Sequence, residues 1–294
     1  MEVKKMGVVG FGQMGSGIAQ VAAMAGLPTL VHEVSQAVLN HGMGKVEDSL
    51  ARLVKKGTLQ SIQKDSIRAR IRGTTKLKDF ADCDLVIEAI TENIDEKKVL
   101  FHQLDKVVKT EAIFASNTSS LCITEMMSVT GRAPRFIGLH FFYPVPVMKL
   151  VEIVKTIVTD PAVVDWAVNF AGKLGKSPIV TSDRAGFIVN RLLIPYLMDA
   201  VRALEEGFGS VEEIDKAMHL GLGHPMGPLT LLDFVGMDTS YYIANILYEE
   251  YREARFAPPP LLRRMVLAGY LGRKSGKGFY DYTNPSSPKP AKFS

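Results

Sequence analysis

The first half of the chain alternates short apolar runs with longer segments whose apolar positions recur with a helical period. The short runs predict buried strands, and the segments between them predict amphipathic helices. Strands separated by helices are typical of βαβ units and therefore of a largely parallel sheet. The predicted strands cover residues 6–9, 29–32, 84–90 and 112–116, and the predicted helices cover residues 18–25, 45–56, 62–71 and 95–108. Gly57 and Gly73 are the expected ends of the two middle helices.

Two later strands, residues 136–142 and 149–154, are joined by only a short loop that contains prolines. A crossover helix does not fit in this loop, so the second strand is expected to run antiparallel to the first. A helix over residues 163–174 then leads to a strand over residues 177–181, which we expect to close the sheet.

Strands disappear from the pattern after residue 186, and helical periodicity takes over. The tail, residues 284–294, is rich in proline, serine and lysine and is expected to fray. The change of pattern near residues 183–186 predicts an α/β domain over residues 1–184 and an all-α domain over residues 185–294. The helices expected in the second domain cover residues 187–206, 211–220, 229–251 and 261–271.

The first predicted strand is followed at once by G-x-G-x-x-G and then by a helix. Gly10 would allow a tight turn, Gly12 would let a pyrophosphate approach the backbone, and Gly15 would let the helix contact the strand. Gln13 and Met14 lie within the motif, and the N-terminus of the helix that follows it offers free N–H groups and a positive dipole end that suit phosphates. In this strand–turn–helix context the motif indicates a Rossmann-type domain that binds a dinucleotide.

Glu33 ends the second predicted strand, at the distance from the glycine motif where such domains place an acid. Its carboxylate would accept hydrogen bonds from the adenosine ribose diol and would repel a 2′-phosphate. Residues 34–36 supply no arginine to bind such a phosphate, so NAD is favoured over NADP. The alternative is a strand-end carboxylate that faces only water.

Composition narrows the class of protein. A chain of 294 residues with 47% hydrophobic content can form about two cores, and its net charge of +4 is modest. Few aromatic residues interleave with the basic ones, which disfavours nucleic-acid binding. The sequence shows no signal segment and no apolar run near 18 residues, so we expect a cytoplasmic protein without a membrane span. The two cysteines lack metal-ligand spacing, and no metal is expected.

His140 is the histidine best placed for catalysis, because it lies late on a strand at the carboxyl edge of the sheet, where open α/β folds bind ligands. If the two antiparallel strands turn symmetrically about Pro146, His140 faces Glu152. The carboxylate would then fix the imidazole tautomer and stabilise the protonated ring. From spacing alone a structural His–Glu pair is an equally good interpretation. The neighbouring dinucleotide motif favours the catalytic one.

From about residue 6 to residue 282 the chain resembles the L-3-hydroxyacyl-CoA dehydrogenase family, which includes the bacterial 3-hydroxybutyryl-CoA dehydrogenases. The segments that carry the resemblance are GFGQMGSGIAQVAA, EAITENIDEKK, FASNTSSLCIT, GLHFFYPVPVMKLVEIV, DRAGFIVNRLLIPYL, HPMGPLTLLDFVGMDT and GRKSGKGFYDY.

The resemblance implies a catalytic His140 with Glu152 as its partner, and it adds Ser119 and Asn190 to the active site. Ser119 would hydrogen-bond the substrate oxygen at C3, and Asn190 would donate to that oxygen or to the thioester carbonyl. Without the resemblance, Ser119 is better explained as a helix N-cap and Asn190 as a polar residue of an interdomain helix.

The resemblance also implies cofactor contacts at Glu92, Lys97, Ser119 and Lys274. For coenzyme A it implies contacts at Ser119 and at two residues of a basic helical pair, Ser49 and Lys56. A charged helical pair can equally be a solvated face.

The chain departs from the family pattern at one position, Tyr143, where the family usually has an asparagine beside the nicotinamide. Tyrosine can donate one hydrogen bond, but it is bulkier and lacks the paired donor and acceptor of an amide. This departure therefore puts in question the contact that the resemblance implies between Tyr143 and the cofactor.

Taken together, the resemblance implies NAD-dependent oxidation of (S)-3-hydroxyacyl-CoA, with 3-hydroxybutyryl-CoA as the expected substrate, or the reverse reduction. It also implies a homodimer formed through the helical domain, where apolar residues are abundant. One alternative is a gulonate-type dehydrogenase of small hydroxy acids, and another is a non-catalytic NAD-binding relative. The apolar residues that suggested the interface are Leu192, Leu193, Ile194, Tyr196 and Leu197.

Overall fold

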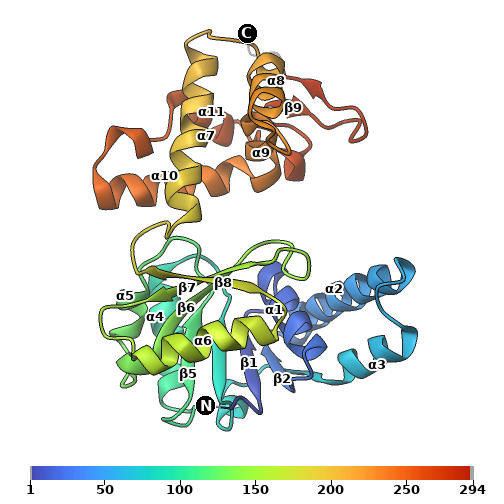
Figure 1. Ribbon diagram of the computed structural model, residues 1–294, viewed down its shortest axis with the longest axis vertical. Coiled ribbons are helices and arrows are strands. Elements are labelled where there is room, and N and C mark those ends of the chain that lie inside the picture. The colour runs from blue at the N-terminus through green and yellow to red at the C-terminus, as the bar shows by residue number, and fades with distance from the viewer. Residues whose placement is uncertain (1, 292–294) are drawn as a thin grey trace. The chain divides into compact units, whose positions relative to one another are not determined.

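The computed structural model describes residues 2–291. It divides into two compact units, the first ending at Phe187 and the second beginning at Ile188. The first unit is built around a twisted sheet, and the second is built mainly of helices (Figure 1). This is the fold class expected from the sequence, an α/β unit followed by a helical one.

The sheet of the first unit has eight strands in the order β3-β2-β1-β4-β5-β6-β7-β8. Every neighbouring pair is parallel except β6 and β7, which confirms the antiparallel turn expected there. β8 lies at the far edge, as predicted for the strand that closes the sheet. The strands are β1 Met6–Val9, β2 Thr29–His32, β3 Ile71–Thr74, β4 Leu85–Glu88, β5 Ile113–Ser116, β6 Phe136–Phe141, β7 Leu150–Lys155 and β8 Ser177–Ser182.

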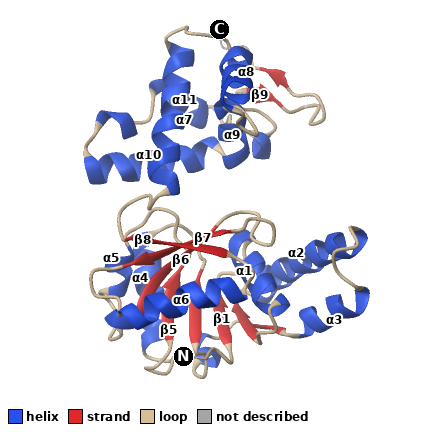
Figure 2. Ribbon diagram, in the orientation of Figure 1, coloured by secondary structure: helices blue, strands red, loops and turns tan. Residues whose placement is uncertain are grey.

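Helices cover both faces of this sheet (Figure 2), and the side chains of each strand alternate between them. Val8 belongs to the core that includes residues of α1, α2 and α6, whereas Val9 belongs to a second core that includes residues of α4 and α5. Both faces of the sheet are therefore covered and kept from water. The helices are α1 Gln13–Met24, α2 Gln36–Lys55, α3 Ser61–Ala69, α4 Ile94–Asp105, α5 Ile123–Met127 and α6 Pro161–Lys173, with short 3-10 turns η1 Leu77–Phe80 and η2 Ala133–Arg135.

Several local expectations for the first unit were wrong. Helix α1 begins at Gln13 rather than at residue 18, and helix α5 was not predicted. Residues 71–74 form the edge strand β3 rather than the end of a helix, so Gly73 lies within a strand. Pairing with β2 and burial of Ile71 in the core outweigh the helical pattern there. Helix α2 also begins earlier than predicted, because the Ser35 side chain caps it by accepting from the backbone N–H of Val38.

The second unit contains α7 Val189–Glu205, α8 Val211–Leu222, α9 Pro228–Val235, α10 Met237–Tyr251 and α11 Pro260–Leu267, with 3-10 turns η3 Ala254–Phe256 and η4 Arg273–Ser275. The single helix predicted for residues 229–251 is divided in two, because Gly236 adopts φ 103°, which no helix accommodates. A two-stranded ladder, β9 Tyr280–Asp281 with β10 Lys289–Pro290, was not predicted and includes part of the tail that was expected to fray. The last residues of that tail, 292–294, lie outside the described residues.

Two buried carboxylates fasten the C-terminal segment to helices α8 and α9. Asp233 accepts hydrogen bonds from the backbone N–H groups of Phe279 and Tyr280 and from the Tyr282 hydroxyl, all within 3.0 Å. Asp215 accepts from the Tyr280 hydroxyl and from the first N–H groups of α9. Burial raises the pKa of Asp233 to about 6 despite these donors.

Candidate active site

The carboxyl ends of the parallel strands bring most of the predicted site residues of the first unit to one edge of the sheet. Glu88 ends β4 and pairs with Ser116, the last residue of β5, while Ser116 pairs with Gly138 of β6. His140 follows two residues later, on the same face of β6 as Gly138.

The glycine loop connects β1 to α1 at this edge. Gly10 has φ 88°, and a Cβ on Gly15 would lie 1.8 Å from the Gly10 carbonyl oxygen, so both positions require glycine. Gly12 is the N-cap residue of α1 and has no atom within 4 Å of where a Cβ would stand. The open space at Gly12 and the uncapped first turn suit the pyrophosphate of a dinucleotide.

Glu33 is held against the same loop. Its Oε1 accepts the backbone N–H of Phe11 at 2.6 Å, and its Oε2 accepts that of Val34 at 3.2 Å. The carboxylate is half-buried and therefore still accessible. Each of its oxygens can accept a further hydrogen bond. This placement beside the glycine loop suits the ribose contact expected for an NAD-binding domain.

His140 and Glu152 face each other across the antiparallel ladder, the pairing expected from the turn at Pro146. The distance from His140 Nδ1 to Glu152 Oε2 is 2.7 Å, and the Glu152 side chain is completely buried. With its Nδ1 hydrogen donated to the carboxylate, the ring presents its Nε2 lone pair as a base.

Aromatic rings surround this pair. The His140 ring lies 4.4 Å from the Phe142 ring and 5.6 Å from the Phe187 ring, centre to centre. Phe187 is buried although its φ of 48° is unusual for a residue with a side chain. These apolar walls lower the local polarity and so strengthen the His–Glu interaction.

A second polar network joins the ends of β4 and β5 to α4. The Lys97 ammonium is only 1% exposed and lies 2.5 Å from Glu88 Oε1 and 3.2 Å from Glu92 Oε2. Glu92 Oε1 in turn accepts the backbone N–H of Ser119 at 2.9 Å and its hydroxyl at 3.2 Å. The Ser116 hydroxyl donates to Glu88.

The two carboxylates of this network respond differently to their surroundings. Burial raises the pKa of Glu88 more than its ion pair with Lys97 lowers it. At Glu92 burial also raises the pKa, but Lys97 and the donors from Thr118 and Ser119 outweigh it, so the net shift is downward. Glu92 is therefore ionised, and its oxygens are oriented by fixed donors.

The structure brings together only some of the predicted residues. Ser119, Glu92 and Lys97 form one network, and His140 with Glu152 forms another. Tyr143 lies in the loop after β6 and is 50% exposed. Ser49 and Lys56 lie along and just beyond α2. In the second unit Asn190 is buried near the start of α7, and Lys274 pairs with Asp238 at 2.5 Å.

Sequence reasoning missed Glu88, Ser116 and Asn117. The signal that could have found Glu88 is the one used for Glu33, an acid at the carboxyl end of a parallel strand, because β4 ends at Glu88 rather than at residue 90 as predicted. Asn117 immediately follows β5, and its side-chain oxygen accepts the backbone N–H of Phe141 at 2.9 Å, which ties β5 to the end of β6.

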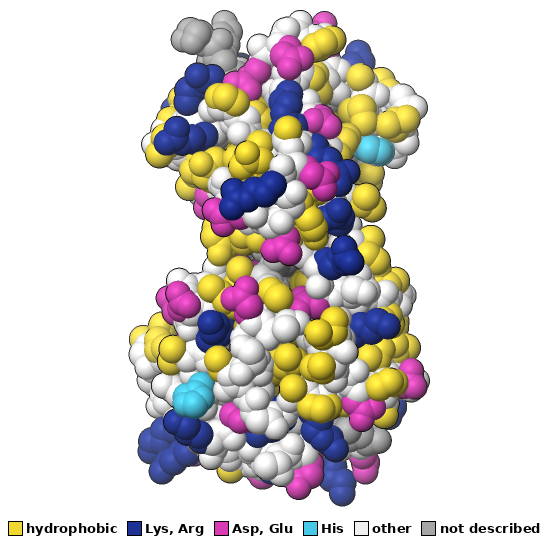
Figure 3. Space-filling view, turned by 90° about the vertical axis from the view of Figure 1, so that its left-hand side faces the viewer, with side chains coloured by type: hydrophobic (Ala, Val, Ile, Leu, Met, Phe, Trp, Pro, Cys, Tyr) yellow, Lys and Arg dark blue, Asp and Glu magenta, His cyan; other side chains and the backbone are white. Residues whose placement is uncertain are grey.

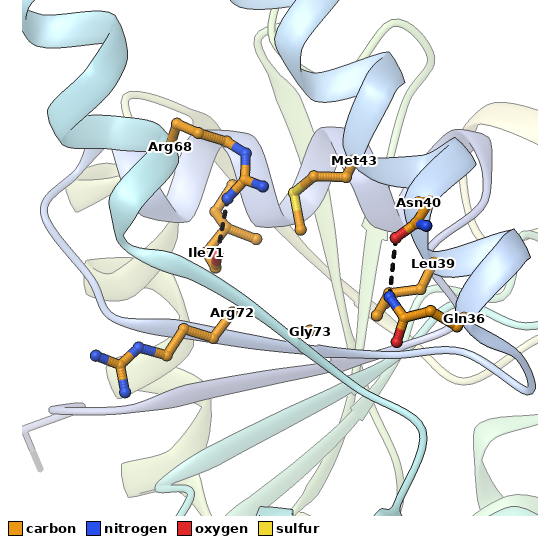
Figure 4. A pocket seen from close by; sticks show the side chains of 8 residues that line it. All are labelled: Gln36, Leu39, Asn40, Met43, Arg68, Ile71, Arg72 and Gly73. Atoms are coloured by element: carbon orange, nitrogen blue, oxygen red, sulfur yellow. Dashed lines mark hydrogen bonds between the residues drawn. The ribbon is translucent and has the colours of Figure 1, made fainter.

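A hollow of about 420 Å³ lies between α2, the end of α3 and β3 (Figure 4). Gln36 and Asn40, which line it, hydrogen-bond to each other at 2.8 Å. Five strand spacings separate β3 from β6, or roughly 24 Å, so this hollow is not the reaction centre. It is lined by Gln36, Leu39, Asn40, Met43, Arg68, Ile71, Arg72 and Gly73.

On the face drawn in Figure 3, lysine and arginine side chains are interspersed with acidic and apolar ones. Within residues 2–291, none of the helices combines the length and the apolar character that a membrane span requires.

Comparison with known proteins shows the family to which the two units belong. The family model for the 3-hydroxyacyl-CoA dehydrogenase NAD binding domain matches residues 5–184, and that for the C-terminal domain matches residues 186–282. A probable 3-hydroxybutyryl-CoA dehydrogenase of Deinococcus radiodurans is 49% identical over 95% of this chain and 100% of its own length. The mitochondrial hydroxyacyl-coenzyme A dehydrogenase of Sus scrofa is 44% identical over 95% of this chain and 91% of its own length.

Solved structures show the same relationship. The crystal structure of (S)-3-hydroxybutyryl-CoA dehydrogenase from Ralstonia eutropha superposes with a TM-score of 0.93 at 45% identity, covering 96% of this chain and 100% of that one. The resemblance expected from the sequence motifs is therefore confirmed along nearly the whole chain. The protein belongs to the 3-hydroxyacyl-CoA dehydrogenase family, and its first domain is the NAD-binding domain of that family.

Proposed function

We propose that the protein oxidises (S)-3-hydroxyacyl-CoA to 3-oxoacyl-CoA with NAD, or catalyses the reverse reduction, and that 3-hydroxybutyryl-CoA is its substrate. The observation that carries the proposal is the buried His140–Glu152 pair, with 2.7 Å between Nδ1 and Oε2, at the carboxyl edge of an NAD-binding domain. Open α/β sheets bind their ligands at this edge.

In the oxidative direction, His140 Nε2 accepts the proton of the substrate hydroxyl group while the C3 hydrogen leaves as hydride. NAD, when bound, supplies the hydride acceptor at C4 of its nicotinamide. Glu152 holds the ring through Nδ1 and stabilises the imidazolium that forms, because its negative charge is buried beside the ring. In the reductive direction the same imidazolium returns the proton to the developing alkoxide.

The remaining site residues have positioning or binding roles in this proposal. Ser119 and Asn190 would hydrogen-bond the reacting oxygen or the thioester, and Ser49, Lys56 and Ser119 would contact coenzyme A. The backbone N–H groups at the start of α1 would bind the pyrophosphate, and the Glu33 carboxylate would bind the ribose. The residues assigned to the cofactor are Gly10, Gly12, Gln13, Met14, Gly15, Glu33, Glu92, Lys97, Ser119, Tyr143 and Lys274.

The proposal includes the functional division at residues 1–184 and 185–294, a cytoplasmic location and a homodimer formed through the helical domain. The 71% exposure of Leu192 on α7 supports an apolar contact there. Ile194 and Leu197, also expected at the interface, are buried within the unit and belong to its core instead.

The test is NADH oxidation with acetoacetyl-CoA, longer 3-oxoacyl-CoA thioesters and free oxo acids, together with NAD reduction with free hydroxy acids. Turnover of the thioesters, with none of free hydroxy or oxo acids, is the expected result. Preference for a free acid such as a gulonate would indicate the alternative dehydrogenase class. Binding of NADH without any turnover would indicate a non-catalytic relative.

The Glu33 carboxylate predicts a preference for NADH over NADPH. A 2′-phosphate would meet this negative charge beside Phe11 N, so kcat/KM with NADPH should be at least tenfold lower. Steady-state kinetics with both cofactors measures the ratio of kcat/KM with NADH to kcat/KM with NADPH. Glu33→Gln, which removes only the charge, should lower this ratio. Equal kcat/KM values in the wild type would show that the carboxylate does not face the ribose.

Tyr143→Asn is expected to tighten NAD binding or raise turnover. The half-exposed ring stands where the family has an amide, and one recovered hydrogen bond contributes about 1 kcal/mol. Dissociation constants for NADH and kcat of the variant measure the gain. A clear fall in kcat/KM would mean instead that Tyr143 is a working substitute for the asparagine.

A further inference from the structure

One buried lysine outside the proposed site contacts the loop that joins β6 and β7, the strands that carry His140 and Glu152. Lys176 lies between α6 and β8 and is 8% exposed. Its ammonium donates to the carbonyl oxygens of Val145 and of Met148, the latter at 2.8 Å. Both carbonyls belong to residues 142–149, which we call the β6–β7 loop. This loop follows His140 by two residues and precedes Glu152 by three.

The placement of this ammonium is costly and therefore calls for an explanation. Burial lowers the pKa of Lys176, and the positive charge of Lys149 lowers it further. A lysine is almost never buried without a compensating group, and here the compensation comes from two carbonyl dipoles of a single loop. Removing the ammonium would leave both carbonyls without this donor.

The same loop also packs on the helix that is expected to bind the cofactor phosphates. Val145 is 1% exposed and belongs to the core shared with α1. A Cβ added to Gly17 of α1 would lie 2.8 Å from the Val145 Cβ, so the two segments are in direct contact. Gly17 follows Gly15 of the glycine loop by two residues. The β6–β7 loop therefore lies between the ammonium of Lys176 and helix α1.

The geometry points to Lys176 as a positioning residue, which clamps the β6–β7 loop against α1 and so fixes the His140–Glu152 pair relative to the cofactor helix. Hydride transfer demands such alignment, because a misplacement of about 1 Å can cost up to 100-fold in rate. Tyr143, which this loop carries, would be held in the same way. The inference rests on the proposed reaction at His140 and names a residue that supports it.

The test compares Lys176→Met, which keeps an unbranched side chain as far as Cε but removes the ammonium donor, with Lys176→Arg and with Lys173→Met. Lys173 is exposed three residues earlier and serves as the matched control. For Lys176→Met we expect kcat with acetoacetyl-CoA to fall at least tenfold per folded molecule. The inhibition constant of ADP-ribose should stay within threefold, because the glycine loop and Glu33 are untouched. Lys176→Arg should recover part of kcat, and Lys173→Met should match the wild type.

A purely structural role would lower the melting temperature while leaving kcat per folded molecule normal, and that result would overturn the inference. If Lys176→Met does not fold, Gly17→Ala tests the same contact from the α1 side. Its new methyl group would push Val145 and should produce the same loss of kcat with little change in ADP-ribose binding, and a normal kcat would count against the clamp. Wild-type protein that fails to reduce acetoacetyl-CoA would contradict the proposed function itself. Failure of the proposed function can thus be told apart from failure of the inference about Lys176.

Discussion

Replacing His140 by glutamine is expected to lower kcat by 100-fold or more while leaving NADH binding nearly unchanged. Glutamine can still hydrogen-bond Glu152, but its amide cannot accept the substrate proton at neutral pH. General-base catalysis contributes about 100-fold to 10,000-fold, so the loss should fall in that range. Steady-state kinetics with acetoacetyl-CoA and NADH fluorescence titration measure the two quantities separately.

Two companion variants sharpen this test. Glu152→Gln keeps the hydrogen bond to Nδ1 but removes the buried charge that stabilises the imidazolium, so it should also lower kcat. His41→Gln changes an exposed histidine on α2 and should have no effect. Near-normal turnover of His140→Gln would remove the histidine from the mechanism, whatever the other variants show.

The His140–Glu152 contact could be predicted because it depends only on local rules. The short loop at Pro146 forces an antiparallel turn, and the two-residue period of a strand then decides which side chains face each other. The glycine loop is predictable for a similar reason. Gly10 and Gly15 are required by a positive φ and by a close backbone contact, both of which lie within one strand–turn–helix unit.

The features that the sequence did not reveal depend on tertiary contacts. Strand β3 has only one buried residue, Ile71, so no alternating pattern marks it. The break at Gly236 requires a backbone angle that a helical pattern of side chains does not encode. The burial of Lys97 and Lys176 is likewise invisible, since nothing local separates them from the many exposed lysines of the chain.

Replacing Lys97 by methionine is expected to destabilise the protein by about 3–5 kcal/mol, the usual cost of removing one partner from a buried ion pair. Glu88 would be left fully buried with no cation beside it, so its ionised form would become costly, and Glu92 would lose the cation that holds it ionised. Urea denaturation at pH 8 measures the free energy of unfolding. Lys106→Met, which alters an exposed lysine just beyond the same helix, should change it by less than about 0.5 kcal/mol.

The double variant Lys97→Met/Glu88→Gln separates charge from shape. It removes both buried charges of the closer pair, so we expect it to be more stable than Lys97→Met alone. The pH dependence gives a further check. Burial already raises the pKa of Glu88 above its unfolded value, and loss of Lys97 would raise it more. A carboxyl group whose pKa is raised in the folded state lowers the stability of the protein as the pH rises through that range. The loss of unfolding free energy in Lys97→Met should therefore be smaller at pH 5 than at pH 8. A deficit that is the same at both pH values, or a double variant no better than the single one, would show that Lys97 stabilises the fold by packing rather than by charge.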